Sequence, residues 1–316
     1  MLSKGFPKNY PESVIALGFF DGVHLGHQAV LNQAATIATK EKKPLRIITF
    51  YPHPRNSIGH SHTIKYITTY IEKYQRLQSF YPGCEVYFLR FNRQLRHTPP
   101  ERFLDLINHW FKPIAVITGE NFRFGYRTQG DQLFLQNFFK KRGVETAIIP
   151  SISLDGAVLS STMIRQLIEK GDIKKVNMVL GYPFSIRGRV VKGKQIGSQI
   201  GFPTANLFPV SSKIMPPHGV YFGYMSWKRV EYPALIYIGT KPTVSQNQRR
   251  VVEVHIAHHI RQSLYQERIT VQLQQFWRLE KHFPTIEGLR EQITVDQAAF
   301  NAGFQAFQFV GLDAST

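Results

Sequence analysis

The segment Gly18–His27 constrains the fold of this chain more than any other stretch of its sequence. It reads Gly-Phe-Phe-Asp-Gly-Val-His-Leu-Gly-His and begins at the end of an apolar run, Val14–Phe19, that is typical of a short buried strand. From His27 to about Lys40 apolar residues recur at helical spacing, and Leu45–Phe50 reads as a second strand. A strand, a glycine-containing turn, a helix and a second strand form a βαβ unit, which predicts parallel pairing and a right-handed crossover.

The same alternation continues to about residue 170 and predicts an α/β domain with a doubly wound sheet. Further helices are expected at Ile67–Leu77, Pro100–Trp110, Asp131–Lys141 and Ser161–Lys170, and further strands at Val86–Phe91, Ile114–Thr118 and Val144–Ile149. After about Gly181 short strands follow one another with turns between them, which predicts a small antiparallel β-barrel. A helical pattern from Ile286 to about Ala302 follows the barrel strands. We therefore expect a Rossmann-like α/β domain over residues 1–180 and a β-barrel domain with a C-terminal helix over residues 181–316.

The residue types of the first segment suit a phosphate site. Gly18, Gly22 and Gly26 let the backbone approach a bulky anion. His24 and His27 stand at a helix start, where backbone N–H groups and the helix dipole favour negative charge. Two imidazoles there are able to donate hydrogen bonds to phosphate oxygens and to stabilise charge on a phosphorus under attack. The alternatives are solvated or core histidines, or a pair of zinc ligands, which no cysteine accompanies.

Three further segments carry polar residues next to predicted strands and helices. Thr49–Pro54, Thr-Phe-Tyr-Pro-His-Pro, lies at the end of the second strand, where doubly wound sheets bind ligands. Gly119–Gly125 follows a later strand and offers the Asn121 amide and the Phe122 ring for a flat ligand, or forms an ordinary turn with aromatic packing. Ser160–Arg165 opens a helix, so its hydroxyl groups serve either as helix caps or, with the arginine, as phosphate contacts.

The second half has a glycine-rich strand and loop. Gly188 and Gly193 precede Gly201–Asn206, which reads Gly-Phe-Pro-Thr-Ala-Asn. Backbone N–H groups of such a loop are able to wrap phosphates. The Thr204 hydroxyl and the Asn206 carbonyl are hard oxygen ligands suited to Mg²⁺. The alternative is a turn-rich corner of the barrel.

Glu253 stands inside the apolar run Val251–Ile256. Burying an unpaired charge is costly, so an acidic residue in such a strand needs a reason. One reason is a general base that takes a proton from a substrate hydroxyl. A salt bridge to a basic neighbour is the rival explanation.

Composition limits the remaining classes of function. Lys and Arg number 39 against 21 Asp and Glu, a net charge of +18 spread along the chain without a clustered stripe. This charge is consistent with a basic nucleic-acid-binding protein, with attraction of small polyanions such as ATP, or with a generally basic surface. The single cysteine, Cys84, excludes an internal disulfide and a cysteine-rich metal site. No signal peptide or membrane span is evident, so we expect a cytoplasmic protein without a membrane partner.

The motifs of the first 180 residues resemble the adenylyltransferase module of bacterial FAD synthetase, a member of the nucleotidylyltransferase superfamily. The likeness rests on residues 18–27, 49–54, 119–125 and 160–165. It implies that the phosphate of FMN attacks the α-phosphorus of ATP, giving FAD and pyrophosphate, with His24 and His27 at the reacting phosphates. By this likeness the ATP contacts are Gly18, Phe20, Asp21, Gly22, His24, Gly26, His27, Ser161, Thr162 and Arg165, and the flavin contacts are Pro54, Asn121, Phe122 and Arg123.

The second half resembles riboflavin kinase, the module fused to the adenylyltransferase in bacterial bifunctional enzymes. The matching segments are residues 201–206, 217–221, 238–243 and 252–255. The resemblance implies that Glu253 activates the ribityl 5′-hydroxyl of riboflavin for attack on the γ-phosphate of ATP, with Mg²⁺ on Thr204 and Asn206. By this likeness the kinase contacts of ATP are Gly188, Gly193, Gly201, Pro203, Thr204 and Asn206, and Arg278 is the flavin contact.

Three places depart from the kinase pattern: Ser198, Tyr237 and residues 257–266. The leading expectation is a bifunctional enzyme that phosphorylates riboflavin to FMN and adenylylates FMN to FAD, with ATP, riboflavin and FMN as its small-molecule partners. The departures motivate an alternative, a monofunctional FAD synthetase with a weak or inactive kinase domain. The charge motivates a non-enzyme alternative, a basic nucleic-acid-binding protein, although no nucleic-acid partner is expected under the leading hypothesis.

Overall fold

The computed structural model of the chain describes residues 11–57, 63–193, 201–242, 248–256 and 263–310. By packing, the chain forms two compact units, residues 1–164 and 165–316. The division falls inside the helix α6 (Ser161–Lys170), which follows the first unit's last strand. The boundary at residue 180 was predicted between two functional domains, whereas these two units are defined by packing alone. The functional boundary therefore stays a prediction.

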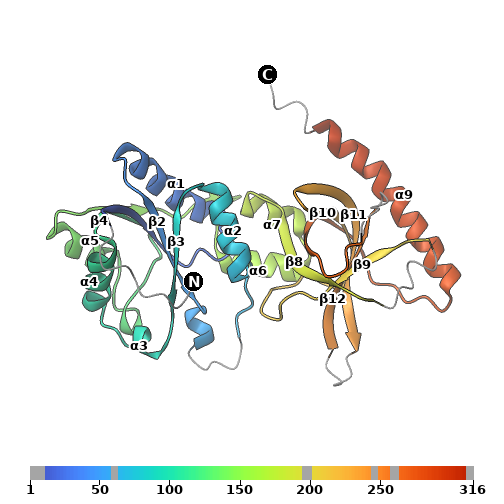
Figure 1. Cartoon of the computed structure of the whole chain (residues 1–316), viewed down its shortest axis with the longest axis horizontal. Helices are drawn as coiled ribbons and strands as arrows, with labels where there is room; N and C mark the ends of the chain where they lie inside the picture. The colour runs from blue at the N-terminus through green and yellow to red at the C-terminus, as the bar shows by residue number, and fades with distance from the viewer. Residues whose placement is uncertain (1–10, 58–62, 194–200, 243–247, 257–262, 311–316) are drawn as a thin grey trace. The chain divides into compact units, whose positions relative to one another are not determined.

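The first unit contains a five-stranded parallel sheet (Figure 1) with the strand order β3-β2-β1-β4-β5. Strands β2 and β3 therefore lie on one side of β1, and the chain then crosses to the other side, where it forms β4 and β5. Ligands of such sheets bind where the order reverses, at the carboxyl ends of the two central strands. The strands are β1 (Ser13–Leu17), β2 (Leu45–Tyr51), β3 (Glu85–Arg90), β4 (Pro113–Gly119) and β5 (Glu145–Ile149).

Helices cover both faces of this sheet, as the alternation along β1 shows. Val14 and Ala16 pack into one apolar cluster with α1, whereas Ile15 and Leu17 pack into another with α4 and α5. Burial on both faces is what an all-parallel sheet requires. The elements outside the sheet are α1 (Leu25–Lys40), α2 (Tyr70–Phe80), α3 (Arg93–Arg96), α4 (Pro100–Phe111), α5 (Gln132–Lys140), the 3₁₀ turns Pro54–Ser57 and Tyr126–Thr128, and the hairpin β6 (Ser153–Leu154) and β7 (Ala157–Val158).

The second unit is a closed antiparallel barrel with the order β10-β11-β12-β9-β8-β13. Its helix α7 packs on the barrel through Asn177, whose amide donates to the Leu273 carbonyl at 2.8 Å and accepts from the Phe184 N–H at 2.7 Å. The elements are α7 (Ile173–Leu180), β8 (Phe184–Val191), β9 (Thr204–Leu207), β10 (Gly219–Trp227), β11 (Val230–Pro242), β12 (Gln248–Ile256), β13 (Arg268–Leu279) and α9 (Ile286–Val310).

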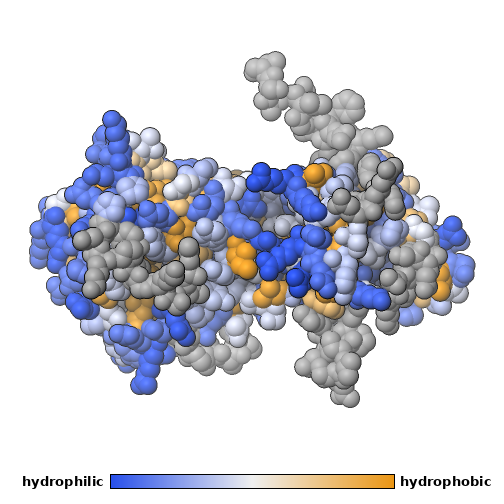
Figure 2. Space-filling model, in the orientation of Figure 1, coloured by the Kyte–Doolittle hydropathy of each residue, from blue (hydrophilic) through white to orange (hydrophobic). Residues whose placement is uncertain are grey.

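The predicted fold class, a doubly wound α/β domain followed by a small β-barrel with a C-terminal helix, is confirmed. The prediction lacked α7 and β9 as well as the short elements α3, β6 and β7 and the two 3₁₀ turns, and α9 ends at Val310 rather than near residue 302. On the face shown in Figure 2, hydrophilic residues predominate and hydrophobic residues occur as scattered patches.

Candidate functional sites

The glycine-containing loop follows β1 directly and has an unusual backbone. Phe20 has φ 48°, Gly22 has φ 85° and Val23 has φ 39°. A positive φ is costly for any residue with a Cβ and is a clear outlier for a branched one such as valine. Such a conformation persists only where the surrounding structure holds it, and it is common at ligand sites.

Hydrogen bonds from the segment before α2 hold this loop. The carboxylate of Asp21 accepts from the backbone N–H groups of Ile67 at 3.2 Å and Thr68 at 3.1 Å. The Gly22 N–H donates to the Thr68 hydroxyl at 3.0 Å, and a Cβ added at Gly22 would lie 3.0 Å from the Ile67 side chain. Asp21 is only 2% exposed, so the structure turns this predicted ATP contact inward to shape the loop.

The two histidines of the motif lie against each other. The rings of His24 and His27 stack with centroids 3.7 Å apart, and the edge of Phe20 meets His27 at 5.4 Å. His24 is the N-cap of α1, with an extended backbone and no side-chain cap, and the first turn of the helix contains no acidic residue. Burial lowers the pKa of His27 well below its usual 6.5, and the charges of His24 and Lys73 lower it further. His27 is therefore neutral at pH 7.

The hydroxyl groups of Ser160 and Ser161 bind different parts of the chain, and the phosphate contact expected of Ser161 stays a prediction. Ser160 caps α6, because its hydroxyl accepts from the Met163 N–H at 3.2 Å. Ser161 donates its hydroxyl to the Asp21 carbonyl at 3.0 Å and so joins the loop. Thr162 is exposed, and Arg165 is the first residue of the second unit.

The predicted flavin contacts lie beyond β4, the strand beside β1. Asn121 is exposed and its amide donates to the Ser151 hydroxyl at 2.8 Å. Phe122 is 9% exposed and packs between the rings of Phe50 at 6.5 Å and Phe124 at 5.8 Å. Arg123 donates to the Gln132 side chain at 2.5 Å, and Pro54 opens a 3₁₀ turn. The aromatic packing that was the alternative for Phe122 is thus present, and its role toward flavin stays a prediction.

One buried residue behind the loop was missed. Lys73 of α2 is 5% exposed, and its ammonium donates to the Phe19 carbonyl at 2.6 Å. The available signal was its spacing, since Lys73 falls on the same helical face as Tyr70 and Leu77. A lysine on an apolar face is ordinarily explained by its stem reaching to solvent. Only the fold shows that this one points inward.

In the second unit a pocket of about 320 Å³ opens between barrel strands and α9. Its walls are mainly apolar and include Val220, Leu235 and Phe283. Convergent polar groups in an apolar cavity of this size are typical of a small-molecule site. The polar side chains that line it are Thr204, Tyr237, Glu253, His255, Arg278, Lys281 and Asp296.

Strand register brings the predicted kinase residues together. Glu253 of β12 pairs with Asn206 of β9, and His255 pairs with Thr204 two residues away. Side chains of directly paired residues lie about 5 Å apart on one face of a sheet. Asn206 is 6% exposed, and a Cβ added at Gly193 would lie 2.5 Å from its amide nitrogen. The general-base candidate and both oxygen-ligand candidates therefore share one face of the sheet, and Glu253 and Thr204 form part of the pocket wall.

The remaining predicted ATP contacts of the kinase surround this wall. A Cβ added at Gly188 would lie 2.8 Å from the Leu207 side chain, so β8 approaches β9 closely there. Gly201 has φ 88°, which favours glycine, and the Pro203 carbonyl accepts a hydrogen bond from His255.

His255 is a polar residue of the pocket that the sequence did not single out. Its Nδ1 lies 3.1 Å from the Pro203 carbonyl, which only accepts, so Nδ1 carries the proton. Burial lowers the pKa of the imidazole. Its Nε2 is buried and has no hydrogen-bond partner among the described residues. The ring thus presents a lone pair as an acceptor in the pocket.

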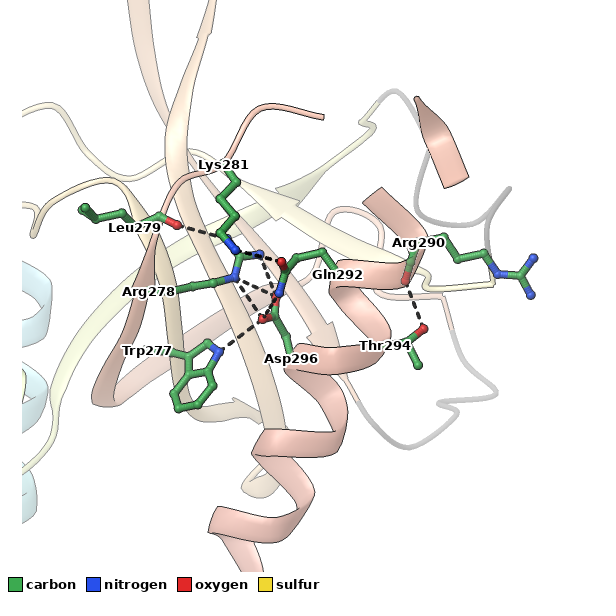
Figure 3. A network of polar contacts seen from close by, with 8 residues as sticks. All are labelled: Trp277, Arg278, Leu279, Lys281, Arg290, Gln292, Thr294 and Asp296. Atoms are coloured by element: carbon green, nitrogen blue, oxygen red, sulfur yellow. Dashed lines mark hydrogen bonds and ion pairs between the residues drawn. The ribbon is translucent and has the colours of Figure 1, made fainter. Parts of the chain in front are cut away.

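Arg278 is held by a carboxylate from α9, also missed from the sequence (Figure 3). Its guanidinium binds Asp296 with distances of 2.7 to 3.1 Å, and Asp296 also accepts from Trp277 at 3.2 Å and Gln292 at 3.1 Å. Lys281 donates to Gln292 at 3.0 Å. This network fixes α9 against the end of β13 and places Arg278 on the pocket wall.

The departures from the kinase pattern are only partly within the described residues. Ser198 and residues 257–262 lie outside them. Tyr237 pairs with Glu253 across β11 and β12, lines the pocket and donates its hydroxyl to Glu280. Glu280 in turn lies 3.4 Å from His218. Tyr237 thus forms part of the pocket wall beside the candidate base.

Two absences hold within the described part of the chain. No group of three or more His, Cys, Asp or Glu side chains there is arranged to hold a metal ion. No helix there is long and apolar enough to cross a membrane.

Comparisons with known proteins match both halves of the chain. A family described as FAD synthetase matches residues 6–163, and a family described as riboflavin kinase matches residues 180–304. A relative from Listeria monocytogenes called bifunctional riboflavin kinase/FMN adenylyltransferase is 32% identical over 293 residues, which cover 92% of each chain. A relative of the same name from Bacillus subtilis is 32% identical over 290 residues, which cover 90% of each chain. The Escherichia coli K12 protein of that name is 32% identical over 289 residues, again covering 90% of each chain.

A solved structure from Streptococcus pneumoniae, named a macrolide-efflux protein, superposes with a TM-score of 0.83 at 28% identity and covers 93% of this chain and 96% of its own. That name differs from those of the sequence relatives. Both matched families are enzymes, so the non-enzyme alternative is not retained. With both modules present in one chain and relatives matched over nine-tenths of its length, this protein belongs to the family of bifunctional riboflavin kinase/FMN adenylyltransferases.

Proposed function

We propose that the barrel pocket phosphorylates riboflavin with Glu253 as general base, and that the loop Gly18–His27 transfers the adenylyl group with His24 and His27. The observation that carries the first assignment is the pairing of Glu253, which lines the pocket, with Asn206 of the neighbouring strand. The second is supported by the buried His24 and the half-buried His27, whose rings stack beyond the carboxyl end of β1.

In the kinase step Glu253 accepts the proton of the ribityl 5′-hydroxyl, and that oxygen attacks the γ-phosphorus of ATP. The bond to the β,γ-bridging oxygen breaks and ADP leaves, which gives FMN. Such transfers depend mainly on positioning and on neutralising charge. The apolar walls exclude water from the reacting oxygen, and Arg278, held by Asp296, orients the flavin end of the pocket.

We propose Mg²⁺ as the metal of this step. The Thr204 hydroxyl and the Asn206 carbonyl fit it, because Mg²⁺ prefers oxygen and is usually held by one or two protein groups together with substrate phosphates. The close approach of Gly193 to Asn206 leaves the amide little freedom to turn away. When bound, the ion neutralises charge on the phosphates.

In the adenylyl step a phosphate oxygen of FMN attacks the α-phosphorus of ATP, and pyrophosphate leaves. A neutral imidazole still donates one N–H, so His27 is able to bind a phosphate oxygen without carrying charge. The N–H groups at the start of α1 face the same loop and favour an anion there. No side-chain nucleophile is required.

The assignment is tested by two variants measured in both half-reactions. Purified chain is incubated with ATP, Mg²⁺ and either riboflavin or FMN, and the flavins are resolved by chromatography. Glu253→Ala is expected to stop FMN formation and to leave FAD formation from FMN intact. His27→Ala is expected to do the reverse, and omitting Mg²⁺ to stop the kinase step.

A folded variant that loses both half-reactions would contradict the two-site assignment. The same assay on the unaltered chain measures the rate of riboflavin phosphorylation with Tyr237 in place. A very low rate would favour the alternative of a weak or inactive kinase domain. We also propose a cytoplasmic location, where ATP is available, which cell fractionation with an antibody tests.

A further inference from the structure

The ammonium of Lys73 is bound to the backbone of the adenylyl-transfer loop. Its Nζ lies 2.6 Å from the Phe19 carbonyl and 3.3 Å from the Thr49 hydroxyl. The Thr49 hydroxyl donates to the same carbonyl at 2.8 Å. Thr49 is fully buried and Lys73 nearly so. One carbonyl thus accepts two buried hydrogen bonds, from α2 and from β2.

This carbonyl stands at the start of a segment with strained backbone. Phe19 is followed directly by Phe20, and Gly22 and Val23 also have positive φ. The segment that leads into α2 holds the loop further along, through the bonds of Ile67 and Thr68 described above. Lys73 therefore adds a third point at which this one element fixes the loop.

Stability alone is a poor reason for a buried lysine, since an apolar residue of similar size avoids the cost of burying the charge. The carboxylate that acts on Lys73 electrostatically is Asp21, but the Asp21 oxygens are bonded to the backbone before α2. The positive charge of Lys73 is therefore not consumed in a direct ion pair with Asp21. It acts instead on the loop and on His27, whose pKa it helps to lower.

We propose that Lys73 is a positioning residue for adenylyl transfer, which fixes the Phe19 carbonyl and places a buried positive charge behind the histidine loop. The proposal rests on the assignment of adenylyl transfer to this loop. Electrostatic groups that are already in place cost no reorganisation at the moment of reaction, and a water-poor site strengthens them. A polyanion such as ATP, bound at the start of α1, would feel this charge from behind the backbone.

The surroundings of Lys73 predict how its charge depends on pH. Two charged or titratable groups face it: Asp21, which raises the pKa of Lys73, and His27, whose pKa Lys73 lowers. The ring of Phe88 also faces it, with its centroid 5.7 Å from Nζ. Glu72 on the same helix is engaged in capping the Thr69 N–H at 2.7 Å. Burial lowers the pKa of Lys73 to about 8, against the opposing effect of Asp21. Its charge is therefore present at pH 7 and is lost as the pH rises through that region.

The test measures FAD formation from FMN in the full-length chain, as kcat and KM for ATP between pH 6.5 and 10. Lys73→Met is expected to lower kcat/KM for ATP by about 10- to 100-fold at pH 7, the range expected when a hydrogen bond to a charged group is lost. The unaltered chain is expected to lose kcat/KM above pH 8. Lys73→Arg keeps a charge throughout this range, so its profile should stay flat to pH 10.

Two controls separate this role from a general effect on the fold. Riboflavin phosphorylation by the same preparations reports on the other unit and should not change. Lys141→Met removes an exposed lysine of the same unit and should leave FAD formation unchanged. Thr49→Val removes the neutral donor to the Phe19 carbonyl, so it should lower kcat but keep the decline above pH 8.

The proposal is overturned if Lys73→Met matches Lys141→Met, or if Lys73→Arg keeps the decline above pH 8. If Lys73→Met does not fold, the Arg and Thr49 variants still decide it through their pH profiles. Loss of FAD formation in His27→Ala, together with normal kinetics in the Lys73 variants, would refute this inference alone. Normal FAD formation in His27→Ala would instead refute the underlying assignment.

Discussion

At the scale of single residues, the contact between His24 and His27 sets a limit on charge. Rings stacked at 3.7 Å cannot both be protonated without strong repulsion, and burial disfavours even one charge. The protein thus has two imidazoles whose hydrogen-bonding capacity matters more than their charge. Lys73 behind them adds a buried positive charge, which together with burial and the charge of His24 keeps His27 neutral.

This arrangement predicts a loss of stability in acid. The pKa of His27 in the folded chain is below 6.5, its value when unfolded, so the unfolded chain binds more protons in the interval between the two. Stability is full above pH 6.5 and falls as the pH drops from there toward the lowered pKa. Thermal unfolding at pH 7.5 and pH 5.5 should show a smaller loss for His27→Leu than for the unaltered chain. An equal loss in both proteins would exclude His27 as the source.

The residues that a sequence can predict are those whose role follows from spacing along a strand or helix. Glu253, Thr204 and Asn206 meet as expected because β12 and β9 pair in register. Lys73 and Asp296 were missed because their roles depend on burial against distant segments. For Asp21 the motif position does not reveal that the carboxylate binds the backbone before α2, and its contact with ATP stays a prediction.

At the scale of elements, β9 and α7 show why short segments escape prediction. β9 has only four residues, two of which are the polar Thr204 and Asn206. From sequence alone it therefore cannot be distinguished from the polar loop that precedes it. α7 has eight residues, and its polar Asn177 belongs to the packing against β13. Both elements exist because tertiary contacts stabilise them, whereas the long amphipathic helices and the apolar strands were found from pattern alone.

The helix α9 depends on one buried carboxylate. Asp296 is 2% exposed and binds Arg278, Trp277 and Gln292. Asp296→Ala leaves the guanidinium of Arg278 without its partner and should cost about 3–5 kcal/mol of stability in the second unit. Thermal unfolding and the KM for riboflavin measure the two consequences. Glu291→Gln, an exposed change on the same helix, is the matched control and should alter neither.

An Asp296→Ala variant with normal unfolding and normal KM would show that the network does not anchor α9. A loss confined to FAD formation would be equally incompatible with it, because the network belongs to the barrel unit.

At the scale of the whole molecule, the chain combines two ATP-using sites under a net charge of +18. Both nucleotide substrates are polyanions, whereas riboflavin is uncharged. A basic surface raises the encounter rate of anionic substrates, and salt screens this effect over about 8 Å at physiological ionic strength.

The charge therefore predicts a selective effect of salt. Raising the concentration of potassium chloride from about 0.02 M to 0.5 M should lower kcat/KM for FMN several-fold, because charge-assisted encounter weakens. At saturating ATP, kcat/KM for riboflavin should change little and serves as the internal control. Equal sensitivity of the two flavins would show that salt acts on the protein rather than on steering.

The pairing of β9 with β12 makes the kinase site sensitive to the length of the chain. Side chains alternate between the two faces of a strand, so inserting a single residue within β9 would turn one of Thr204 and Asn206 away from the pocket while the barrel still closed. Inserting two residues would restore the face but shift both partners past Glu253. Insertions within β9 would thus abolish catalysis before they abolish folding. Among related proteins we therefore expect insertions and deletions in the loops on either side of β9 but none within the strand.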